Sequence, residues 1–474
     1  MSRGEVLYNS RVIKQAAVSV IRTLREHGHE AYLVGGCVRD LLLGREPADY
    51  DVATSATPRE VMRIFPETYA VGAQFGVVLV PTDGLTAKDL EDAAKQDAIE
   101  SAVEAAKHKA IEVATFRNDG VYSDGRHPDE VRFSKTAQED VQRRDFTING
   151  LLLDPLDGDR VLDFVGGRSD LQAGIIRTIG EAERRFAEDK LRMLRAVRFA
   201  ARFGYEIEPK TMSAIQRLAP EIHQVSRERI REELTKMLTE GRARKAFQLL
   251  DESKLLHEVL PEIEKMKGVE QPPQYHPEGD VWIHTLLLLE KLPEGVSRTL
   301  AWGALLHDVG KPPTFRRAPD RIRFDLHVEV GVAMAKEICQ GLRMSNDDTE
   351  QILALVNNHM RFADAPKMKE STFKRFIRLP NFDEHLALHR IDCLSSHADL
   401  SLYDYVSTKR AELPPEAIKP APLLTGRDLI AMGYEPGPLF KEMLAAVEDQ
   451  QLEGTLSSRD KAIEFVKANY PVAK

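Results

Sequence analysis

The sequence of 474 residues has few cysteines and tryptophans and lacks long apolar runs. Its three cysteines, Cys37, Cys339 and Cys393, lie far apart and follow no metal-ligand spacing. That usage argues against a disulfide scaffold and indicates a reducing compartment. No stretch approaches the roughly eighteen apolar residues of a membrane helix, and residues 1–10 lack the apolar core of a signal peptide. These absences predict a cytoplasmic protein with no membrane partner.

The chain also lacks a basic charge balance, because 75 Asp and Glu outnumber 66 Lys and Arg and give a net charge of −9. This argues against an overall basic nucleic-acid binder, and we expect no DNA partner. Residues 181–245 depart from the average with 16 Lys and Arg against 11 Asp and Glu, which makes this segment the candidate RNA-facing surface. The length and 42% hydrophobic residues are sufficient for several domains with buried cores.

The most informative stretch reads AYLVGGCVRDLLLGREPADYDVAT. Its pattern predicts a buried strand at residues 32–34, a tight turn at Gly35 and Gly36, and a short helix at residues 38–43. Backbone N–H groups at the start of such a helix favour a bound anion. Arg39 adds a forked donor, so the turn is a candidate phosphate site.

The second half of the same stretch carries two carboxylates. If residues 48–53 form a strand, Asp49 and Asp51 project from one face about 7 Å apart. Two carboxylates on one face can bind hard cations, and Mg²⁺ commonly combines such carboxylates with substrate phosphates. A lone glycine pair is usually a turn and a lone Asp-x-Asp a solvated strand edge, but their adjacency suggests a bound nucleoside triphosphate.

The stretch resembles the nucleotidyltransferase core of a bacterial family, the class II tRNA nucleotidyltransferases (CCA-adding enzymes) and poly(A) polymerases. That family's pattern is matched in order by Gly35-Gly36, Arg39-Asp40, Leu42-Leu43-Gly44 and Asp49-Tyr50-Asp51. The resemblance implies that Asp49 and Asp51 hold two Mg²⁺ ions for phosphoryl transfer. Glu112, in a strand predicted at residues 110–116, is a candidate third carboxylate.

A second motif, RRDFTING, begins at Arg143. The side chains of Arg143, Arg144 and Asp145 suit contacts to triphosphate and ribose. Alone such a run would be solvated surface, but it matches the family's Arg-Arg-Asp-Phe-Thr motif. Before it, residues 117–133 are rich in Gly, Asp and Pro and predict a mobile loop. This loop resembles one that is implied, in the family, to help the switch from adding C to adding A.

A third motif lies in residues 188–203, EDKLRMLRAVRFAARF, which we predict to be helical. Asp189 and Arg192 then share a face and can pair with the Watson–Crick edge of a base. The same spacing elsewhere would be an ordinary ion pair worth about 0.3–0.5 kcal/mol. The family's Glu-Asp-x-x-Arg motif implies that the two side chains select C and A over U and G. We expect Arg195 to face phosphate or a neighbouring carboxylate.

One stretch departs from the family pattern. Residues 82–109 are rich in Ala, Glu and Lys, have helical propensity and show no sustained apolar face. In the family a short turn joins the strands on either side. We expect a surface excursion here, because loops tolerate insertions well, with contact to RNA as the alternative.

A set of histidines and aspartates appears after Pro272, on predicted helices or at their ends. Imidazoles combined with carboxylates suit a transition metal such as Zn, Fe or Ni. The pattern resembles the HD phosphohydrolase superfamily, which implies the ligands His284, His307, Asp308 and Asp392 and the auxiliary residues His327 and His359. An HD fold that only supports RNA is the open alternative, because a fold does not specify an activity.

We therefore predict a multidomain α+β protein, in which an N-terminal nucleotidyltransferase domain with a short mixed sheet is followed by helical domains. The predicted boundaries are a catalytic domain at 1–160 with a helical insertion at about 84–109, an RNA- and nucleotide-binding neck at 161–268, an HD domain at 269–410, and a linker with a helical tail at 411–474. The Pro-rich residues 412–422 predict a stiff linker.

The predicted activity is template-independent addition of CCA, from CTP and ATP, to the 3′ end of tRNA. Recognition of tRNA would depend on shape and backbone contacts. Three alternatives stay open. The chain could be a poly(A) polymerase or an enzyme that adds only CC or only A. It could act mainly as an HD phosphohydrolase, or it could be an RNA-binding protein with a vestigial core.

Overall fold

The computed structural model describes residues 3–68, 76–81, 110–119, 131–274 and 276–471. The predicted insertion at 84–109 and the interior of the loop predicted at 117–133 lie outside this range. The chain divides into two compact units, Met1–Met237 with Lys245–Val259, and Leu238–Arg244 with Leu260–Lys474. Among the described residues, no helix is long and apolar enough to cross a membrane.

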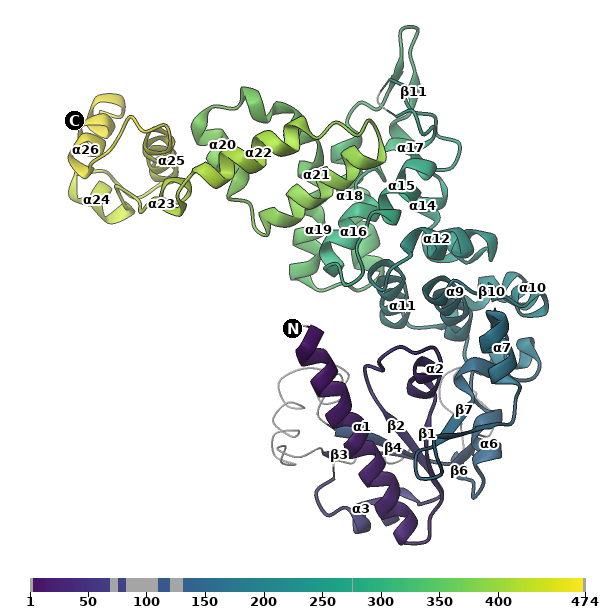
Figure 1. Ribbon diagram of the computed structural model, residues 1–474. Helices are drawn as coiled ribbons and strands as arrows, with labels where there is room; N and C mark the ends of the chain where they lie inside the picture. Colours follow the sequence, from purple (N-terminus) through teal and green to yellow (C-terminus); the bar gives the residue numbers. More distant parts are fainter. Residues whose placement is uncertain (1–2, 69–75, 82–109, 120–130, 275, 472–474) are drawn as a thin grey trace. The chain divides into compact units, whose positions relative to one another are not determined.

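A six-stranded mixed sheet with the order β3-β4-β2-β1-β7-β8 forms the centre of the first unit (Figure 1). Its strands are β1 (Ala31–Val34), β2 (Asp51–Thr54), β3 (Val77–Pro81), β4 (Ala110–Thr115), β7 (Leu151–Asp154) and β8 (Arg160–Asp163). Only β2 and β4 pair in parallel, and the other neighbours are antiparallel. The mixed sheet predicted from the sequence is confirmed.

Helices cover this sheet and position its loops. Helix α1 (Arg3–Glu26) packs across β1, β2 and β4, and α3 (Pro58–Ile64) packs against β3, β4 and α1. A capping box between Thr57 and Glu60, with Pro58 in the first turn, starts α3. The short helices α2 (Gly36–Leu42), α6 (Ala137–Gln142) and η2 (Thr147–Asn149) stand at the ends of strands.

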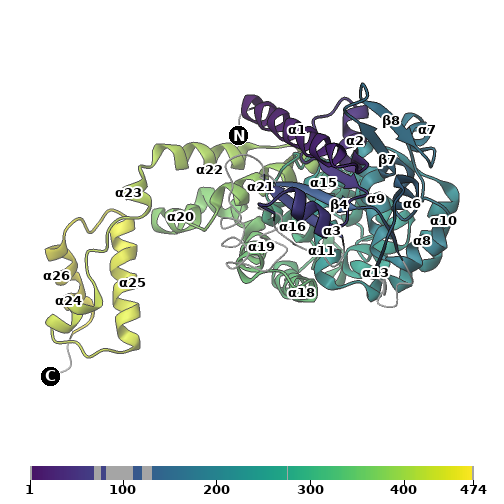
Figure 2. The same ribbon diagram turned by 90° about the horizontal axis from the view of Figure 1, so that it is seen from below.

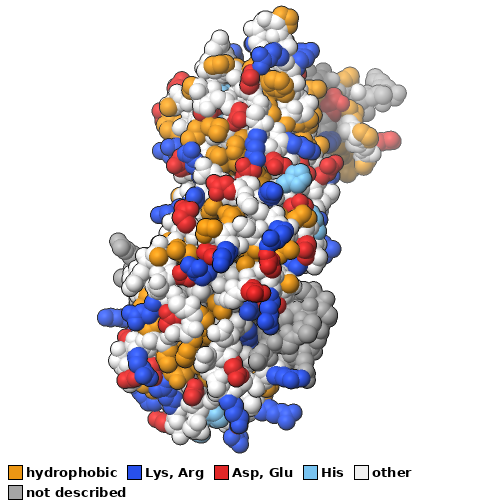
Figure 3. All heavy atoms as spheres, turned by 90° about the vertical axis from the view of Figure 1, so that its right-hand side faces the viewer, with side chains coloured by type: hydrophobic (Ala, Val, Ile, Leu, Met, Phe, Trp, Pro, Cys, Tyr) orange, Lys and Arg blue, Asp and Glu red, His pale blue; other side chains and the backbone are white. Residues whose placement is uncertain are grey.

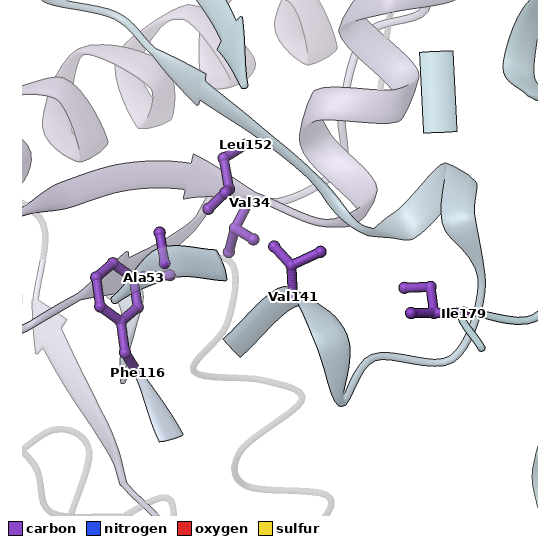
Figure 4. Close-up of a cluster of buried hydrophobic side chains, with 7 residues drawn as sticks. Val34, Ala53, Phe116, Val141, Leu152 and Ile179 are labelled. Carbon is purple, nitrogen blue, oxygen red and sulfur yellow. The ribbon is translucent and has the colours of Figure 1, made fainter. Parts of the chain in front are cut away.

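One apolar cluster holds these elements together (Figure 4). Val34 of β1, Ala53 of β2 and Leu152 of β7 contribute the sheet side, and Val141 of α6 contributes the helix side. Phe116, directly after β4, is completely buried in the same cluster. The site loops at these strand ends are therefore fixed to a packed core.

Two predictions for this unit need correction. The strand expected at 48–53 begins only at Asp51, because its partner β1 ends at Val34, opposite Asp51, and the chain then turns at Gly35. The loop expected at 117–133 has strands at both ends, β5 (Arg117–Asp119) and β6 (Val131–Phe133), which pair antiparallel.

The rest of the first unit, residues 167–237 and 245–259, is mainly helical. Its elements are α7 (Gly167–Ala173), β9 (Ile175–Ile176), α8 (Ala182–Glu188), α9 (Leu191–Phe203), β10 (Glu206–Ile207), α10 (Pro209–Leu218), η3 (Ala219–Gln224), α11 (Arg227–Thr239), α12 (Ala243–Glu252) and α13 (Leu255–Val259). The helix predicted at 188–203 starts later, at Leu191, because Asp189 is extended, with φ −151° and ψ 108°.

The second unit is a helical assembly in which α16 and α21 contact each other and both contact α15 and α19. Its elements are α14 (Pro261–Glu264), α15 (Val281–Glu290), α16 (Arg298–Leu306), α17 (Lys311–Thr314), β11 (Arg316–Arg317), β12 (Ile322–Arg323), α18 (His327–Gly341), α19 (Asn346–Asn358), η4 (His359–Lys367), α20 (Glu370–Ile377), α21 (Phe382–Ser395), α22 (Ser401–Glu412), α23 (Pro415–Ile418), α24 (Gly426–Ala431), α25 (Pro438–Leu452) and α26 (Arg459–Asn469). The predicted stiff linker at 412–422 contains the one-turn helix α23.

The predicted helical tail corresponds to α24, α25 and α26, which lie together in Figure 2. Leu429 of α24, Met443 and Val447 of α25, and Ala462 and Val466 of α26 form one buried cluster. The tail therefore has an apolar core of its own.

Candidate active site and histidine cluster

The glycine turn between β1 and α2 faces an arginine. Gly35 has φ 76°, a conformation that glycine adopts without steric penalty, and a Cβ at this position would lie 3.3 Å from Nη1 of Arg144. A Cβ at Gly36 would lie 3.6 Å from Nη2 of Arg39. The two glycines therefore let two guanidiniums approach the backbone of the turn closely, which suits an anion site.

The predicted carboxylates gather next to this turn. Burial, followed by the negative charges of Asp51 and Asp49, raises the pKa of the Cys37 thiol to about 12, so both carboxylates lie near the start of α2. Val52 pairs with Val113, so the residues before them, Asp51 and Glu112, are neighbours on one face of the sheet. Asp49 precedes β2 and is exposed.

Arg39 is more buried than a surface phosphate ligand, with 5% of its surface exposed. Its Nε donates to Asp40 at 2.9 Å and its Nη1 donates to Asn149 at 2.6 Å. The guanidinium carbon also lies 4.6 Å from the ring centre of Phe203. These contacts tie α2 to the second motif and to α9, and a direct contact between Arg39 and phosphate stays a prediction.

Arg143 and Arg144 share one buried carboxylate, Asp140, which the sequence analysis did not single out. Arg143 donates to Oδ1 of Asp140 at 2.8 Å and Arg144 to Oδ2 at 3.0 Å. Burial alone would raise the pKa of Asp140, but the two guanidiniums outweigh it and lower the pKa. The spacing of three and four residues on one helix was the signal for this role.

Asp145 accepts hydrogen bonds from several protein groups. Arg195 donates to its Oδ2 from Nε at 2.9 Å and from Nη2 at 2.7 Å, and Asn149 donates to Oδ1 at 3.1 Å. Of the two partners expected for Arg195, the structure shows the neighbouring carboxylate. Burial alone would raise the pKa of Asp145, but Arg195 and Asn149 lower it to about 2.

The ion pair of Asp145 and Arg195 should contribute to the stability of the fold in a way that depends on acid pH. Because the folded pKa of Asp145 lies below its ordinary value of 3.8, its charge stabilises the fold above about pH 4, and the contribution is lost as the pH falls towards 2. The contribution is about 2 kcal/mol at neutral pH. We expect the difference in unfolding free energy between wild type and Asp145→Asn to shrink by about 1 kcal/mol between about pH 6 and pH 3 in urea titrations. A difference that is constant with pH contradicts this.

Asp189 and Arg192 do not form the helical pair that the sequence predicts. Asp189 lies before α9, and its Oδ2 accepts a hydrogen bond from Arg229 of α11 at 2.7 Å. Arg192 donates from Nη1 to Glu188 at 2.7 Å and from Nη2 to the carbonyl of Arg143 at 3.3 Å. The break at Asp189 arises from these longer-range partners, which local spacing does not reveal.

Several arginines of the basic segment, residues 181–245, form ion pairs with carboxylates. One example is Arg198, whose Nε lies 2.7 Å from Oε2 of Glu233. Figure 3 likewise shows Lys and Arg side chains interspersed with Asp and Glu on the face that it draws. The excess positive charge of residues 181–245 is therefore partly neutralised within the fold.

The predicted histidine cluster is brought together in the second unit. His284 lies in α15, His307 and Asp308 follow α16, His327 starts α18, His359 follows α19 and Asp392 lies in α21. Nε2 of His284 lies 3.1 Å from Oδ1 of Asp392, and Nε2 of His307 lies 3.2 Å from Oδ2 of Asp308. On the other side, Nε2 of His359 lies 3.8 Å from Oδ1 of Asp308.

Four imidazole nitrogens in this cluster are buried without a hydrogen-bond partner in the described part of the chain, namely Nε2 of His284, His307, His327 and His359. Two of them, on His284 and His307, lie 3.1 and 3.2 Å from carboxylate oxygens without hydrogen-bond geometry. Buried polar atoms are normally hydrogen-bonded, so four such nitrogens beside carboxylates fit a set of metal ligands. The ligand atoms fall into two groups that could each hold a metal ion, His284 with His307 and Asp392, and Asp308 with His327 and His359. Imidazole and carboxylate donors fit a transition metal.

Electrostatics in the cluster favour a cation. Burial alone would raise the pKa of Asp308, but the charges of His307 and Lys311 hold it well below its ordinary range. Burial alone would lower the pKa of His284, but Asp392 and Glu278 raise it to about 9. Asp308, which is buried, and Asp392, whose side chain is 23% exposed, both have lowered pKa values and give the cluster the negative charge that a metal ion needs.

The fold and the first site define a nucleotidyltransferase, and the histidine cluster adds an HD domain. The family pattern described as the Poly A polymerase head domain matches residues 31–177. A second, described as the probable RNA and SrmB-binding site of polymerase A, matches residues 204–267, and the HD domain pattern matches residues 280–399.

Individual relatives give a narrower result. A CCA-adding enzyme of Geobacillus stearothermophilus is 43% identical over 241 residues, and this alignment covers 51% of the chain and only 53% of the relative. A CCA-adding enzyme of Bacillus pumilus is 31% identical over 94% of the chain and 95% of its own length. The crystal structure of Bacillus stearothermophilus CCA-adding enzyme in complex with CTP has a TM-score of 0.69 at 28% identity, covering 96% of this chain and 98% of that one. The chain belongs to the family of CCA-adding enzymes.

Proposed function

We propose that the chain adds C and A, from CTP and ATP, to the 3′ end of tRNA and so completes a CCA terminus. The observation that carries this proposal is the similarity, over 96% of the chain, to a CCA-adding enzyme in complex with CTP. The relative matched over 95% of its own length supports the same activity. We also propose that the protein acts in the cytoplasm.

Asp49 and Asp51 fit the role of Mg²⁺ ligands, because both carboxylates lie near the start of α2 and carboxylate oxygens suit hard cations. Glu112 is the neighbour of Asp51 on the sheet and is a candidate third carboxylate. Two bound Mg²⁺ ions would lower the pKa of the RNA 3′-hydroxyl and neutralise the triphosphate and the leaving pyrophosphate.

The chain's own cationic groups bind and orient the triphosphate in this proposal. Gly35 and Gly36 let the guanidiniums of Arg144 and Arg39 lie close to the backbone of the turn. Arg143 and Arg144 are held in place by Asp140, so that they meet phosphate or ribose without reorganising. Asp145 acts indirectly, since its carboxylate orients Arg195 and Asn149.

Asp189 and Arg192 retain capacity to bind a base. A guanidinium has five N–H groups, and the hydrogen bonds of Arg192 in the described structure occupy three. Asp189 uses three of about four acceptor positions, on Leu191 and Arg229. The remaining acceptor position of Asp189 can accept a hydrogen bond from the exocyclic amine of C or A. It disfavours U and G, because these bases carry a carbonyl at the corresponding position of the base edge.

The test is to incubate the protein with a tRNA that ends at its discriminator base, together with all four nucleoside triphosphates, and to sequence the products. Addition of CCA followed by arrest supports the proposal. Products ending in CC, a single A added only to tRNA that already ends in CC, or a long A tail would each assign the chain to a sibling activity. If the protein extends no tRNA at all, every nucleotidyltransferase assignment is contradicted.

A second candidate activity, metal-dependent phosphohydrolysis by the HD domain, is favoured by the four unpartnered imidazole nitrogens. His284, His307, Asp308 and Asp392 would hold a transition metal, with His327 and His359 next to Asp308. Elemental analysis of the purified protein tests this proposal. Copurifying Zn, Fe or Ni that is lost on His307→Ala supports it, and absence of any transition metal from wild type contradicts it.

We keep the predicted domain division in this proposal, with the head at 1–160, the neck at 161–268, the HD domain at 269–410 and the tail at 411–474. The matched regions at 31–177, 204–267 and 280–399 follow the same order and support it. The partners would be tRNA, CTP and ATP, with no DNA and no membrane.

A further inference from the structure

The four histidines of the cluster are oriented in two different ways. Three of them place Nδ1 close to the backbone carbonyl three residues earlier, His307 to Ala304 at 2.8 Å, His327 to Phe324 at 2.9 Å and His359 to Val356 at 2.7 Å. A carbonyl only accepts hydrogen bonds, so Nδ1 of each ring carries the proton and Nε2 is left as the ligand atom.

His284 differs, because its Nδ1 lies 2.7 Å from Oε1 of a carboxylate side chain, Glu278. The side chain of His284 is fully buried and that of Glu278 is 6% exposed. The same oxygen also lies 2.8 Å from Nδ1 of His276. Among the described residues, Glu278 is therefore the side chain that accepts from Nδ1 of His284, whereas the other three rings donate from Nδ1 to backbone carbonyls.

The trio of His276, Glu278 and His284 has the composition of a metal site, but its distances argue for hydrogen bonds. Two ligand atoms bound to one metal at about 2.1 Å lie about 3.0–3.4 Å apart at the usual angles. The two nitrogen–oxygen distances of 2.7 and 2.8 Å are shorter and fall in the range of hydrogen bonds. His276 and Glu278 are therefore joined to His284 by hydrogen bonds and act on the metal position through His284, rather than sharing a metal ion with it.

The described part of the loop that carries Glu278, residues 269–274 and 276–280, contacts the cluster at a second point. Gln271 accepts a hydrogen bond from Nζ of Lys311 at 2.6 Å, and the same ammonium lies 2.7 Å from Oδ2 of Asp308. Backbone hydrogen bonds fix the loop, since the N–H of Gln271 donates to Gly279 and that of Val281 donates to Val269. The loop is thus placed to set the geometry of two inner residues, His284 and Asp308.

We propose that Glu278 is a positioning residue for the HD metal centre, which fixes His284 with the proton on Nδ1 and presents Nε2 to the metal. This inference rests on the proposed metal centre. A carboxylate behind a ligating histidine fixes the tautomer and raises the basicity of the ligand, and its loss weakens metal binding by about 10–100-fold. The remaining rings keep their backbone acceptors when Glu278 is replaced.

The experiment uses the full chain, stripped of metal and titrated with Co²⁺ in excess Mg²⁺, which keeps the head site occupied. We expect Glu278→Ala to raise the dissociation constant for Co²⁺ by about 10–100-fold with unchanged stoichiometry, and Glu278→Gln to have a smaller effect. The matched control is Glu270→Gln, because Glu270 lies on the same loop, pairs with Arg317 and has 60% of its side chain exposed. Wild-type affinity in Glu278→Ala overturns the proposal, as does a wild-type chain that binds no Co²⁺.

A second readout reports the proton on Nδ1 directly. In ¹⁵N spectra of the chain loaded with Zn²⁺, we expect the Nδ1–H signal of His284 in wild type to shift or disappear in Glu278→Ala, because the acceptor of that proton is removed. An unchanged Nδ1–H signal of His284 in Glu278→Ala overturns the proposal. Extension of tRNA distinguishes the two functions, since it should be the same in wild type and in every Glu278 variant even if the metal centre is absent.

Discussion

Replacement of Asp51 by Ala is expected to lower the rate of nucleotide addition by about 10³-fold, the equivalent of about 4 kcal/mol of transition-state stabilisation. The physical reason is that Asp51 opens β2 beside Glu112 and near the turn at Gly35, where the triphosphate is proposed to bind. The rate is measured as single-turnover extension of tRNA with CTP. Stability should change little, because Asp51 is only partly buried.

The matched control is Asp157→Ala, since the side chain of Asp157 is 60% exposed, lies in the same unit and pairs with Arg160 at 2.8 Å. This control is expected to extend tRNA at the wild-type rate. An Asp51→Ala protein that keeps more than about a tenth of the wild-type rate contradicts a catalytic carboxylate at this position. Unfolding curves of both variants separate a loss of chemistry from a loss of fold.

Replacement of Arg192 by Ala is expected to lower kcat/KM for CTP by about 10–100-fold, because a bidentate contact to a base edge contributes about 1–3 kcal/mol. The preference for CTP over UTP should shrink with it, since the donors of Arg192 distinguish base edges in the proposal. Steady-state extension with each nucleotide measures both quantities.

Arg184→Ala is the matched control for this prediction. Arg184 contacts the same carboxylate, Glu188, at 3.8 Å, but its side chain is 78% exposed. It should therefore leave nucleotide selection unchanged. If Arg192→Ala lowers the rate equally for all four nucleotides, Arg192 holds the fold of α8 and α9 together and does not read the base.

The sequence predicts the head of the protein well where a motif is contiguous. The glycine turn, the strand before it and the Arg-Arg-Asp run are local patterns, and the structure brings Gly35 next to Arg144 across more than a hundred residues. The strands predicted at 32–34 and 110–116 are confirmed as β1 and β4.

Elements whose bounds depend on distant partners could not be predicted in the same way. Local propensity favours one helix from 188 to 203, but Asp189 bonds to Arg229 and leaves the helical conformation. The start of β2 is set by where β1 ends. Tertiary contacts outweigh local preference at both places.

The supporting carboxylates were missed for a related reason. Asp140 was visible in principle, because it lies three and four residues before the two arginines that it binds. Glu278 had no such signal, since its loop carries no periodic pattern and its partner His284 lies on the next helix. A residue that hydrogen-bonds to a binding side chain, without contacting the bound group itself, is recognised only from the three-dimensional structure unless it lies at helical spacing from its partner.

The central claim, that this chain builds a CCA end, is tested most directly with three tRNAs that end at the discriminator base, at C and at CC, each given a single nucleoside triphosphate. The account predicts that CTP alone extends the first two, that ATP alone extends the third by one A, and that UTP and GTP extend none. Extension by UTP or GTP at rates similar to CTP and ATP, or no extension of any tRNA, would contradict it.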